Sequence, residues 1–229
     1  SDLTKMLGWK IGYGHFTGGG TIANFEMLFR SRARLWEWLS AGVVNGIEPI
    51  KAAHMGWEKF DQLDKNKAEE LNPLKADPIS SYQKITKLGY EVQSPVLLVP
   101  FHKHYSWTKG AYIFGIGSSE VWNIPLGQFG HASVEELKKL IDKAIAEKRP
   151  ILAVVSVLGT TEFGFIDPIH EIQNLLDQYF KEQGLKIWHH VDGAYGGFLC
   201  SMKNGDKEMK NLMVEKSWKA IEAVERVDS

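Results

Sequence analysis

The sequence predicts an α/β protein with a mostly parallel sheet flanked by helices, and three observations carry this prediction. Apolar runs alternate with helical patterns through the second half of the chain, which favours parallel strands joined by right-handed crossovers. The run 151–157 is continuously apolar and rich in valine, as in a strand buried on both faces. A second run ends at Asp192 and breaks into the glycines of 193–197, the pattern at a ligand-binding sheet edge.

The first half begins with a glycine-rich turn at 14–20, followed by apolar residues at helical spacings. These residues are Ile22, Phe25, Phe29, Trp36 and Leu39. Residues 41–94 contain three prolines and mixed charge. We expect short helices and loops there, forming an irregular helical insertion.

The second half is predicted element by element. Residues 95–101 indicate a strand despite two prolines, 104–116 a helix and 121–126 a short strand. A capping box at Ser133–Glu136 opens a helix that continues to about residue 148. Asp167 is expected to cap the next helix, with Pro168 in its first turn and Gly184 at its end. A strand over 185–191 and an amphipathic helix over 206–226 complete the pattern.

Composition narrows the function. The chain has 229 residues, 44% of them hydrophobic, and a formal net charge of -1, which fits one large domain. Near-neutral charge argues against nucleic-acid partners and membrane surfaces. Cys200 is the single cysteine, no apolar run reaches the roughly 18 residues of a membrane span, and the first residues lack a signal-peptide pattern. We expect a cytoplasmic protein.

Four segments carry candidate chemistry, each with a structural alternative. The turn before Thr21 suits a phosphate at a helix N-terminus, or is only a flexible turn. His102 and His104 suit ring stacking, proton transfer or metal binding, or lie on the surface. Thr161 lies in the loop after a buried strand, where its hydroxyl suits a ligand at the sheet edge, or this loop is an ordinary strand-to-helix connection. Asp192 suits a cationic ring nitrogen, or is a structural acid.

In this order the segments resemble the group II pyridoxal-phosphate-dependent amino-acid decarboxylases. The matching pieces are Gly14–Asn24, His104–Trp107, Gly159–Gly164 and His190–Gly197. The long interval between the first two pieces looks like that of bacterial tyrosine decarboxylases. The resemblance implies the aspartate-aminotransferase-like fold, fold type I, with residues 1–229 forming part of its large, cofactor-binding domain.

The resemblance also implies the cofactor, pyridoxal 5'-phosphate, and its ligands. Gly19, Gly20 and Thr21 would hold the phosphate, and Asp192 would pair with the ring nitrogen. His104 would stack on the ring and assist proton transfer, while Ala194 would pack on the opposite face. Thr161 would bond near the phenolic oxygen or the substrate carboxylate, and Asn24 and His190 would support these residues. His104 and Asp192 are the predicted catalytic residues, and no metal is implied.

The Schiff-base lysine of the family is missing, because the chain stops at Ser229 about where that segment should begin. We therefore expect a central fragment, inactive alone, of a homodimeric enzyme that decarboxylates a tyrosine-like or acidic L-amino acid. Alternatives are another fold type I pyridoxal-phosphate lyase, a non-catalytic cofactor-binding or partner chain, and a metal hydrolase. The hydrolase would use His102, His104, His189, His190 and Asp192.

Overall fold

A computed structural model describes residues 2–10, 12–204, 211 and 213–229. Its centre is a four-stranded, wholly parallel sheet in the order β2-β1-β3-β4. The strands are β1 (Val96–Pro100), β2 (Val121–Ile124), β3 (Ile151–Val157) and β4 (His189–Asp192). The predicted α/β class with a parallel sheet is confirmed.

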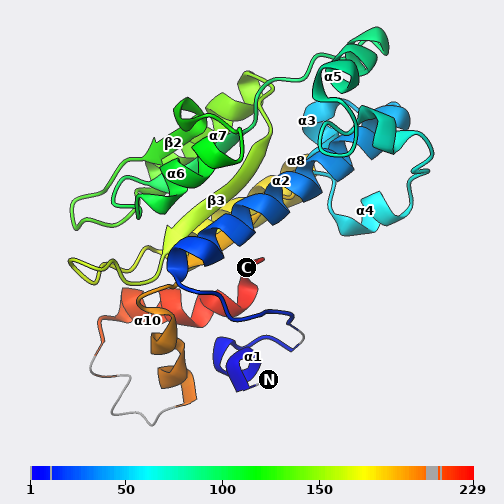
Figure 1. The fold of residues 1–229 in the computed structure, drawn as a ribbon. Helices are drawn as coiled ribbons and strands as arrows, with labels where there is room; N and C mark the ends of the chain where they lie inside the picture. Colours follow the sequence, from blue (N-terminus) through cyan, green and yellow to red (C-terminus); the bar gives the residue numbers. More distant parts are fainter. Residues whose placement is uncertain (1, 11, 205–210, 212) are drawn as a thin grey trace.

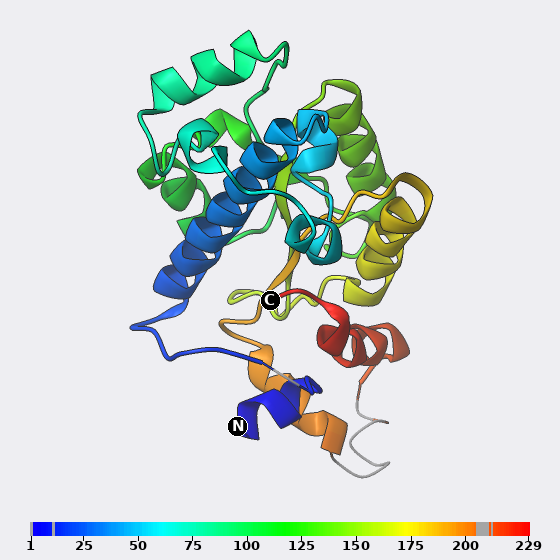
Figure 2. The ribbon, with the colours of Figure 1, turned by 90° about the vertical axis from the view of Figure 1, so that its right-hand side faces the viewer.

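Helices cover both faces of this sheet (Figure 1 and, turned by 90°, Figure 2). One face packs against α2 (Gly20–Val44) and α6 (Ser106–Ile113), and the other against α7 (Val134–Ala146) and α8 (Ile169–Gln183). Side chains of β1 alternate between the two layers: Leu97 and Val99 join the α2 side, and Val96 and Leu98 the α7–α8 side.

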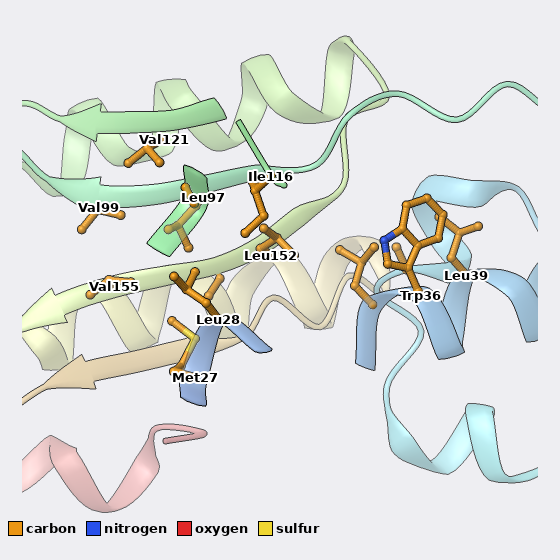
Figure 3. Close-up of a cluster of buried hydrophobic side chains, with 14 of the residues drawn as sticks. Met27, Leu28, Trp36, Leu39, Leu97, Val99, Ile116, Val121, Leu152 and Val155 are labelled. Atoms are coloured by element: carbon orange, nitrogen blue, oxygen red, sulfur yellow. The ribbon is translucent and has the colours of Figure 1, made fainter. Parts of the chain in front are cut away.

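Helix α2 fixes the position of the glycine-rich turn, because its apolar side anchors it along the sheet. Figure 3 shows Leu28 of α2 facing Leu97 and Val155 of the sheet. Ile22 and Phe29, which contributed to the helical pattern, are instead 47% and 57% exposed. The predicted helix is confirmed, and part of its apolar surface does not face the core.

Both predicted central strands are present and fully buried. In β1 the prolines stand immediately before the strand, at Pro95, and at its last position, Pro100. At these positions a missing N–H interrupts little of the ladder. Residues of β3 are buried without exception, as its continuous apolar run predicts. The strand predicted at 185–191 is shorter and later than expected, at His189–Asp192.

Of the two predicted helix N-caps, Ser133 is confirmed and Asp167 is wrong. Ser133 caps α7 by accepting a hydrogen bond from the backbone N–H of Glu136, as predicted. Asp167 does not cap α8, because Pro168 occupies that position and α8 begins at Ile169. The Asp167 carboxylate is instead fully buried and bonds to other segments. Gly184 ends α8 in the left-handed conformation, as predicted.

Residues 41–94 contain the end of α2 and then short helices separated by loops. These helices are α3 (Pro49–Ala52), α4 (Trp57–Asp61), η1 (Ala68–Leu71) and α5 (Pro78–Lys87). The predicted tail helix is wrong in its extent. Its described part is α10 (Glu215–Ala223) with η4 (Val224–Arg226), and 205–210 and 212 lie outside the described residues.

The remaining described elements are α1 (Asp2–Leu7), η2 (Ser118–Glu120) and η3 (Gly197–Asn204). Helices α1 and α10 both lie beside η3, below the sheet in the view of Figure 1. They share a small apolar cluster that includes Cys200 and Ile221. Among the described helices, none combines the length and apolar character that a membrane crossing requires.

Candidate functional site

A cavity of about 570 Å³ opens at the carboxyl edge of the sheet. The register pairs Val157 with Asp192, so the ends of β3 and β4 meet there, and the turn after β1 reaches the same edge. Its lining includes six residues predicted to bind a cofactor: Gly20, Thr21, His104, Thr161, Asp192 and Ala194. Gly19 does not line the cavity and instead precedes the first turn of α2.

The N-terminus of α2 faces the cavity without a side-chain cap. Gly19 occupies the cap position with a φ of 142°, a value that favours glycine, and the first turn contains no acidic residue. Within the described residues, the backbone N–H groups of Gly20 and Thr21 have no acceptor. A Cβ on Gly20 would lie 2.7 Å from the Cβ of Ala194. This helix end is therefore an electropositive cradle for an anion.

The Asp192 carboxylate is 7% exposed and its two oxygens are used unequally. Oδ2 accepts hydrogen bonds from Asn24 Nδ2 at 2.9 Å and from Trp107 Nε1 at 3.1 Å. From the described residues, Oδ1 accepts a single longer bond, 3.3 Å, from the backbone N–H of Ala194. Because a carboxylate accepts about four hydrogen bonds, Oδ1 retains capacity for a donor in the cavity.

Asn24 connects Asp192 to the turn that carries His104. Its Nδ2 also donates to Ser106 Oγ at 2.9 Å. Ser106 Oγ lies 2.8 Å from His104 Nδ1. The His104 side chain itself is exposed and its ring stands 4.2 Å from that of Tyr105, centroid to centroid. A buried chain of polar groups thus joins the two residues predicted to be catalytic.

The two threonines after β3 have different environments. Thr160 is buried, and its hydroxyl accepts the backbone N–H of Phe165 at 3.0 Å, which closes the loop on itself. Thr161 is exposed and lines the cavity. The structure therefore leaves the predicted residue, Thr161, available to a ligand and uses its neighbour for the loop.

His102 lies at the cavity but is engaged with Asp167. Its Nε2 is 3.1 Å from Asp167 Oδ1. Neither His102 nor His104 lies in a strand, so the shared strand face that would favour a metal does not form. His189 points elsewhere, between Ser156 and Gln173. In the part of the chain that the structure describes, no three metal-binding side chains gather, so the metal-hydrolase arrangement is not present.

Strand β4 begins with two histidines whose ring nitrogens are withdrawn from solvent. Burial lowers the pKa of His189 to about 3. Burial also lowers the pKa of His190 to about 4, opposed in part by the nearby Asp192 carboxylate. His190 lies against Trp107, with ring centroids 5.5 Å apart. Both histidines are therefore neutral at pH 7 and support β4 without adding charge.

The sequence of this chain matches a known protein family. Residues 81–220 match the family model described as the pyridoxal-dependent decarboxylase conserved domain. The chain belongs to the pyridoxal-dependent decarboxylase family. The resemblance read from the sequence is confirmed, and so, at the level of the family, is the expected cofactor.

Curated relatives within this decarboxylase family include bacterial enzymes. The L-tyrosine decarboxylase of Levilactobacillus brevis is 32% identical over 88% of this chain and 32% of its own length. The L-tyrosine decarboxylase of Enterococcus faecium is 33% identical over 88% of this chain and 33% of its own length. The chain therefore spans about a third of the length of these relatives.

Solved structures of decarboxylases share the fold. The glutamate decarboxylase domain of a diaminobutyrate-pyruvate transaminase and L-2,4-diaminobutyrate decarboxylase from Vibrio parahaemolyticus superposes with a TM-score of 0.61. It is 24% identical, over 98% of this chain and 37% of that one. Mouse CSAD in its apo form superposes with a TM-score of 0.61. It is 21% identical, over 99% of this chain and 35% of that one. The fold type I assignment is confirmed.

The cavity fits the family's cofactor on its own chemistry. An uncapped helix N-terminus suits a phosphate, and a carboxylate oxygen with spare acceptor capacity suits a protonated ring nitrogen. Both belong to one cavity, in which Gly20 leaves room that a Cβ would fill.

Sequence reasoning missed two contributors, Ser106 and Trp107. Both belong to the matched segment His104–Trp107, yet they are fully buried behind the cavity. Their partners lie 82 and 85 residues away along the chain. The only local signal was a polar residue beside a tryptophan at the start of a helix, which does not reveal a bond to a distant acid.

Proposed function

We propose that this chain forms the cofactor-binding part of a pyridoxal-phosphate-dependent decarboxylase, which converts an L-amino acid to its amine and CO2. The observation that carries the proposal is the Asp192 carboxylate, whose Oδ1 keeps acceptor capacity in the cavity bounded by the uncapped start of α2. Membership of the pyridoxal-dependent decarboxylase family supports the reaction class.

Pyridoxal phosphate, when bound, supplies a protonated ring that withdraws electrons from the bond to the departing carboxylate. Asp192 would hold the proton on the ring nitrogen through its fixed negative charge. The N–H groups of Gly20 and Thr21 would bind the phosphate, with Gly19 shaping their turn. His104 and Ala194 would enclose the ring from opposite faces. Thr161 would donate its hydroxyl hydrogen near the phenolic oxygen or the substrate carboxylate.

We propose an aromatic amino acid, with L-tyrosine as the first candidate, as the substrate. Relatives named L-tyrosine decarboxylases support this choice, as do Tyr105, Phe163 and Tyr195, which line the cavity and are each at least 65% exposed. Aromatic walls of this kind suit a flat ring by stacking. An acidic substrate is the second candidate, because Lys103, a potential cation, also lines the cavity.

The proposal includes a homodimer, a cytoplasmic setting and a place in the large domain. Exposed apolar side chains on the outer surface of α2 and α6, Ile22, Phe29, Tyr112 and Ile113, would form part of the dimer interface. The single, buried cysteine suits a reducing compartment. Residues 41–94 would be an irregular insertion in that domain. Light scattering over a concentration series tests the dimer.

Cofactor binding tests the site directly. The chain should bind pyridoxal phosphate, and quenching of tryptophan fluorescence measures this binding. Inorganic phosphate should compete with the cofactor. Asp192→Ala should weaken binding about tenfold through the lost ion pair. The matched control, Asp177→Ala, removes a carboxylate that is 54% exposed on α8 and should bind normally. Equal binding by the two variants would contradict the proposed site.

Product analysis tests the reaction. An enzyme that carries the family's lysine segment in addition to this chain should release CO2 and the amine in equal amounts from L-tyrosine. An aldehyde fragment in place of CO2 would indicate the alternative lyase. Binding without turnover, in the presence of the lysine segment, would indicate a non-catalytic partner.

A further inference from the structure

A hydrogen-bond chain connects the Asp192 carboxylate to Nδ1 of His104 through Asn24 and Ser106. Asn24 Nδ2 stands 2.9 Å from both Asp192 Oδ2 and Ser106 Oγ. Ser106 Oγ stands 2.8 Å from His104 Nδ1. Asn24 and Ser106 are 3% and 0% exposed, so water does not compete for the two bonds that Asn24 makes, whereas the bond to His104 is partly buried.

The donor inventory sets the direction of the chain. An ionised carboxylate only accepts, so Asn24 turns its NH2 group toward Asp192 and uses its second hydrogen on Ser106 Oγ. Ser106 then has its own hydroxyl hydrogen free to donate to His104 Nδ1. The backbone N–H of Ser106 points at the same nitrogen from 3.3 Å. Two donors directed at Nδ1 leave no place for a hydrogen on it.

We propose that Asn24 and Ser106 are positioning residues that hold His104 as the neutral tautomer with its hydrogen on Nε2. This nitrogen has no protein partner among the described residues and belongs to a side chain that lines the cavity. His104 therefore presents a donor to whatever the cavity holds. The use of that donor in catalysis rests on the proposed function, whereas the tautomer does not.

The hydrogen-bond chain can be interrupted by a substitution while Asp192 keeps a side-chain donor. Trp107 Nε1 donates to the same Oδ2 from 3.1 Å, so the carboxylate keeps a side-chain donor when Asn24 or Ser106 is replaced. A substitution at Ser106 removes the hydroxyl nearest to His104 and leaves both donors of Asp192 in place. The effect on the histidine is thus separable from an effect on the acid.

Nitrogen NMR of the chain labelled with [15N]histidine reads the tautomer without any cofactor. The His104 signals are assigned by their loss in His104→Gln. In alkaline buffer, we expect an unprotonated Nδ1 and a protonated Nε2 in the wild type. Ser106→Ala should mix the two tautomers, and Asn24→Ala should shift them in the same direction. Ser31→Ala is the matched control, because that buried hydroxyl of α2 donates to the carbonyl of Leu28 in its own helix and lies outside this hydrogen-bond chain.

Three results would overturn the proposal: a wild-type hydrogen on Nδ1, a wild-type mixture, or an unchanged tautomer in Ser106→Ala. The wild-type spectrum decides the tautomer even if a variant does not fold. Failure of the proposed function would appear elsewhere, as absent pyridoxal phosphate binding or absent CO2.

The enzyme loaded with cofactor gives a second readout. Ser106→Ala should lower kcat about tenfold while KM stays within about twofold, because a misplaced proton donor affects the reacting state more than substrate binding. Ser106→Thr, which restores a hydroxyl, should recover most of the loss. An equal fall in kcat for Ser31→Ala, or no recovery by threonine, would reduce Ser106 to a structural residue.

Discussion

Asp167 and Asp192 are two buried acids at the same edge of the sheet, with opposite surroundings. Asp167 accepts backbone N–H groups on both oxygens, from Val157 at 2.7 Å and Ala132 at 2.8 Å, and also contacts His102. Asp192 gathers two donors on Oδ2 and leaves Oδ1 with one bond of 3.3 Å. Unused acceptor capacity, more than burial or charge, distinguishes Asp192, for which we propose a ligand, from Asp167, whose carboxylate is taken up by the fold.

Removal of the Asp192 carboxylate should give the largest effect. In the complete enzyme, Asp192→Ala should lower decarboxylation about a thousandfold, because a preorganised charge at the reacting group is lost. The release of CO2 measures this. Turnover within about twofold of the wild type would place Asp192 with Asp167 as a structural acid.

Acidic pH should lower the stability of the fold through two buried histidines. Burial lowers the pKa of His54 and of His189 to about 3, from an ordinary 6.5. The unfolded chain therefore binds protons that the folded chain refuses between pH 6.5 and 3, so stability falls as pH falls through that window. From pH 7 to pH 5 the free energy of unfolding should drop by about 2 kcal/mol for each histidine.

Urea unfolding at the two pH values measures this drop. Replacement of the exposed His15 by glutamine should leave the slope unchanged. A flat profile from pH 7 to pH 5 would contradict the buried, neutral state of both histidines.

Asp167→Asn should cost about 3 kcal/mol of unfolding free energy, with a much smaller effect on cofactor affinity. The substitution turns an NH2 group toward a backbone donor and leaves a buried group unpaired. The partner experiment, Asp177→Asn, weakens an exposed ion pair with Arg226 and should cost less than about 1 kcal/mol. A similar loss of unfolding free energy in the two variants would contradict the structural role of Asp167.

Gly196→Ala should have the smallest effect of this series, about 2 kcal/mol, through overpacking. Its Cβ would clash with the carbonyl oxygen of Leu158, which forces apart the loops that follow β3 and β4. Gly197→Ala, one residue later, would place its Cβ in open space and should change stability by less than about 0.5 kcal/mol. Chemical unfolding compares the two.

Local signals made part of this molecule predictable. The valine-rich run of β3 and the Ser133 cap of α7 each depend on a few neighbouring residues, and both were found. The start of α8 was not, because the Asp167 side chain bonds to Val157 and Ala132 in place of its own helix. A local sequence pattern does not show when backbone groups of other segments bind a polar side chain in place of its own helix.

The candidate site divides in the same way. Asp192 and Thr161 were predictable because parallel strands bring their carboxyl ends to one edge. The bonds of Asn24 to Asp192 and to Ser106 span 168 and 82 residues of sequence, so only the fold reveals them. Six of the cavity residues could be named in advance, while Gly19 was named without lining the cavity and the connections between the residues could not be foreseen.

The outer edge of β4 is covered by the residues Asp228 and Ser229. The N–H of Val191 donates to the carbonyl of Ser229, the N–H of Asp228 donates to the carbonyl of His189, and the Asp228 carboxylate accepts the N–H of His189. Open strand edges invite other chains to add to a sheet. Asp228 and Ser229 thereby occupy N–H and C=O groups of β4 that another chain would need in order to add to the sheet.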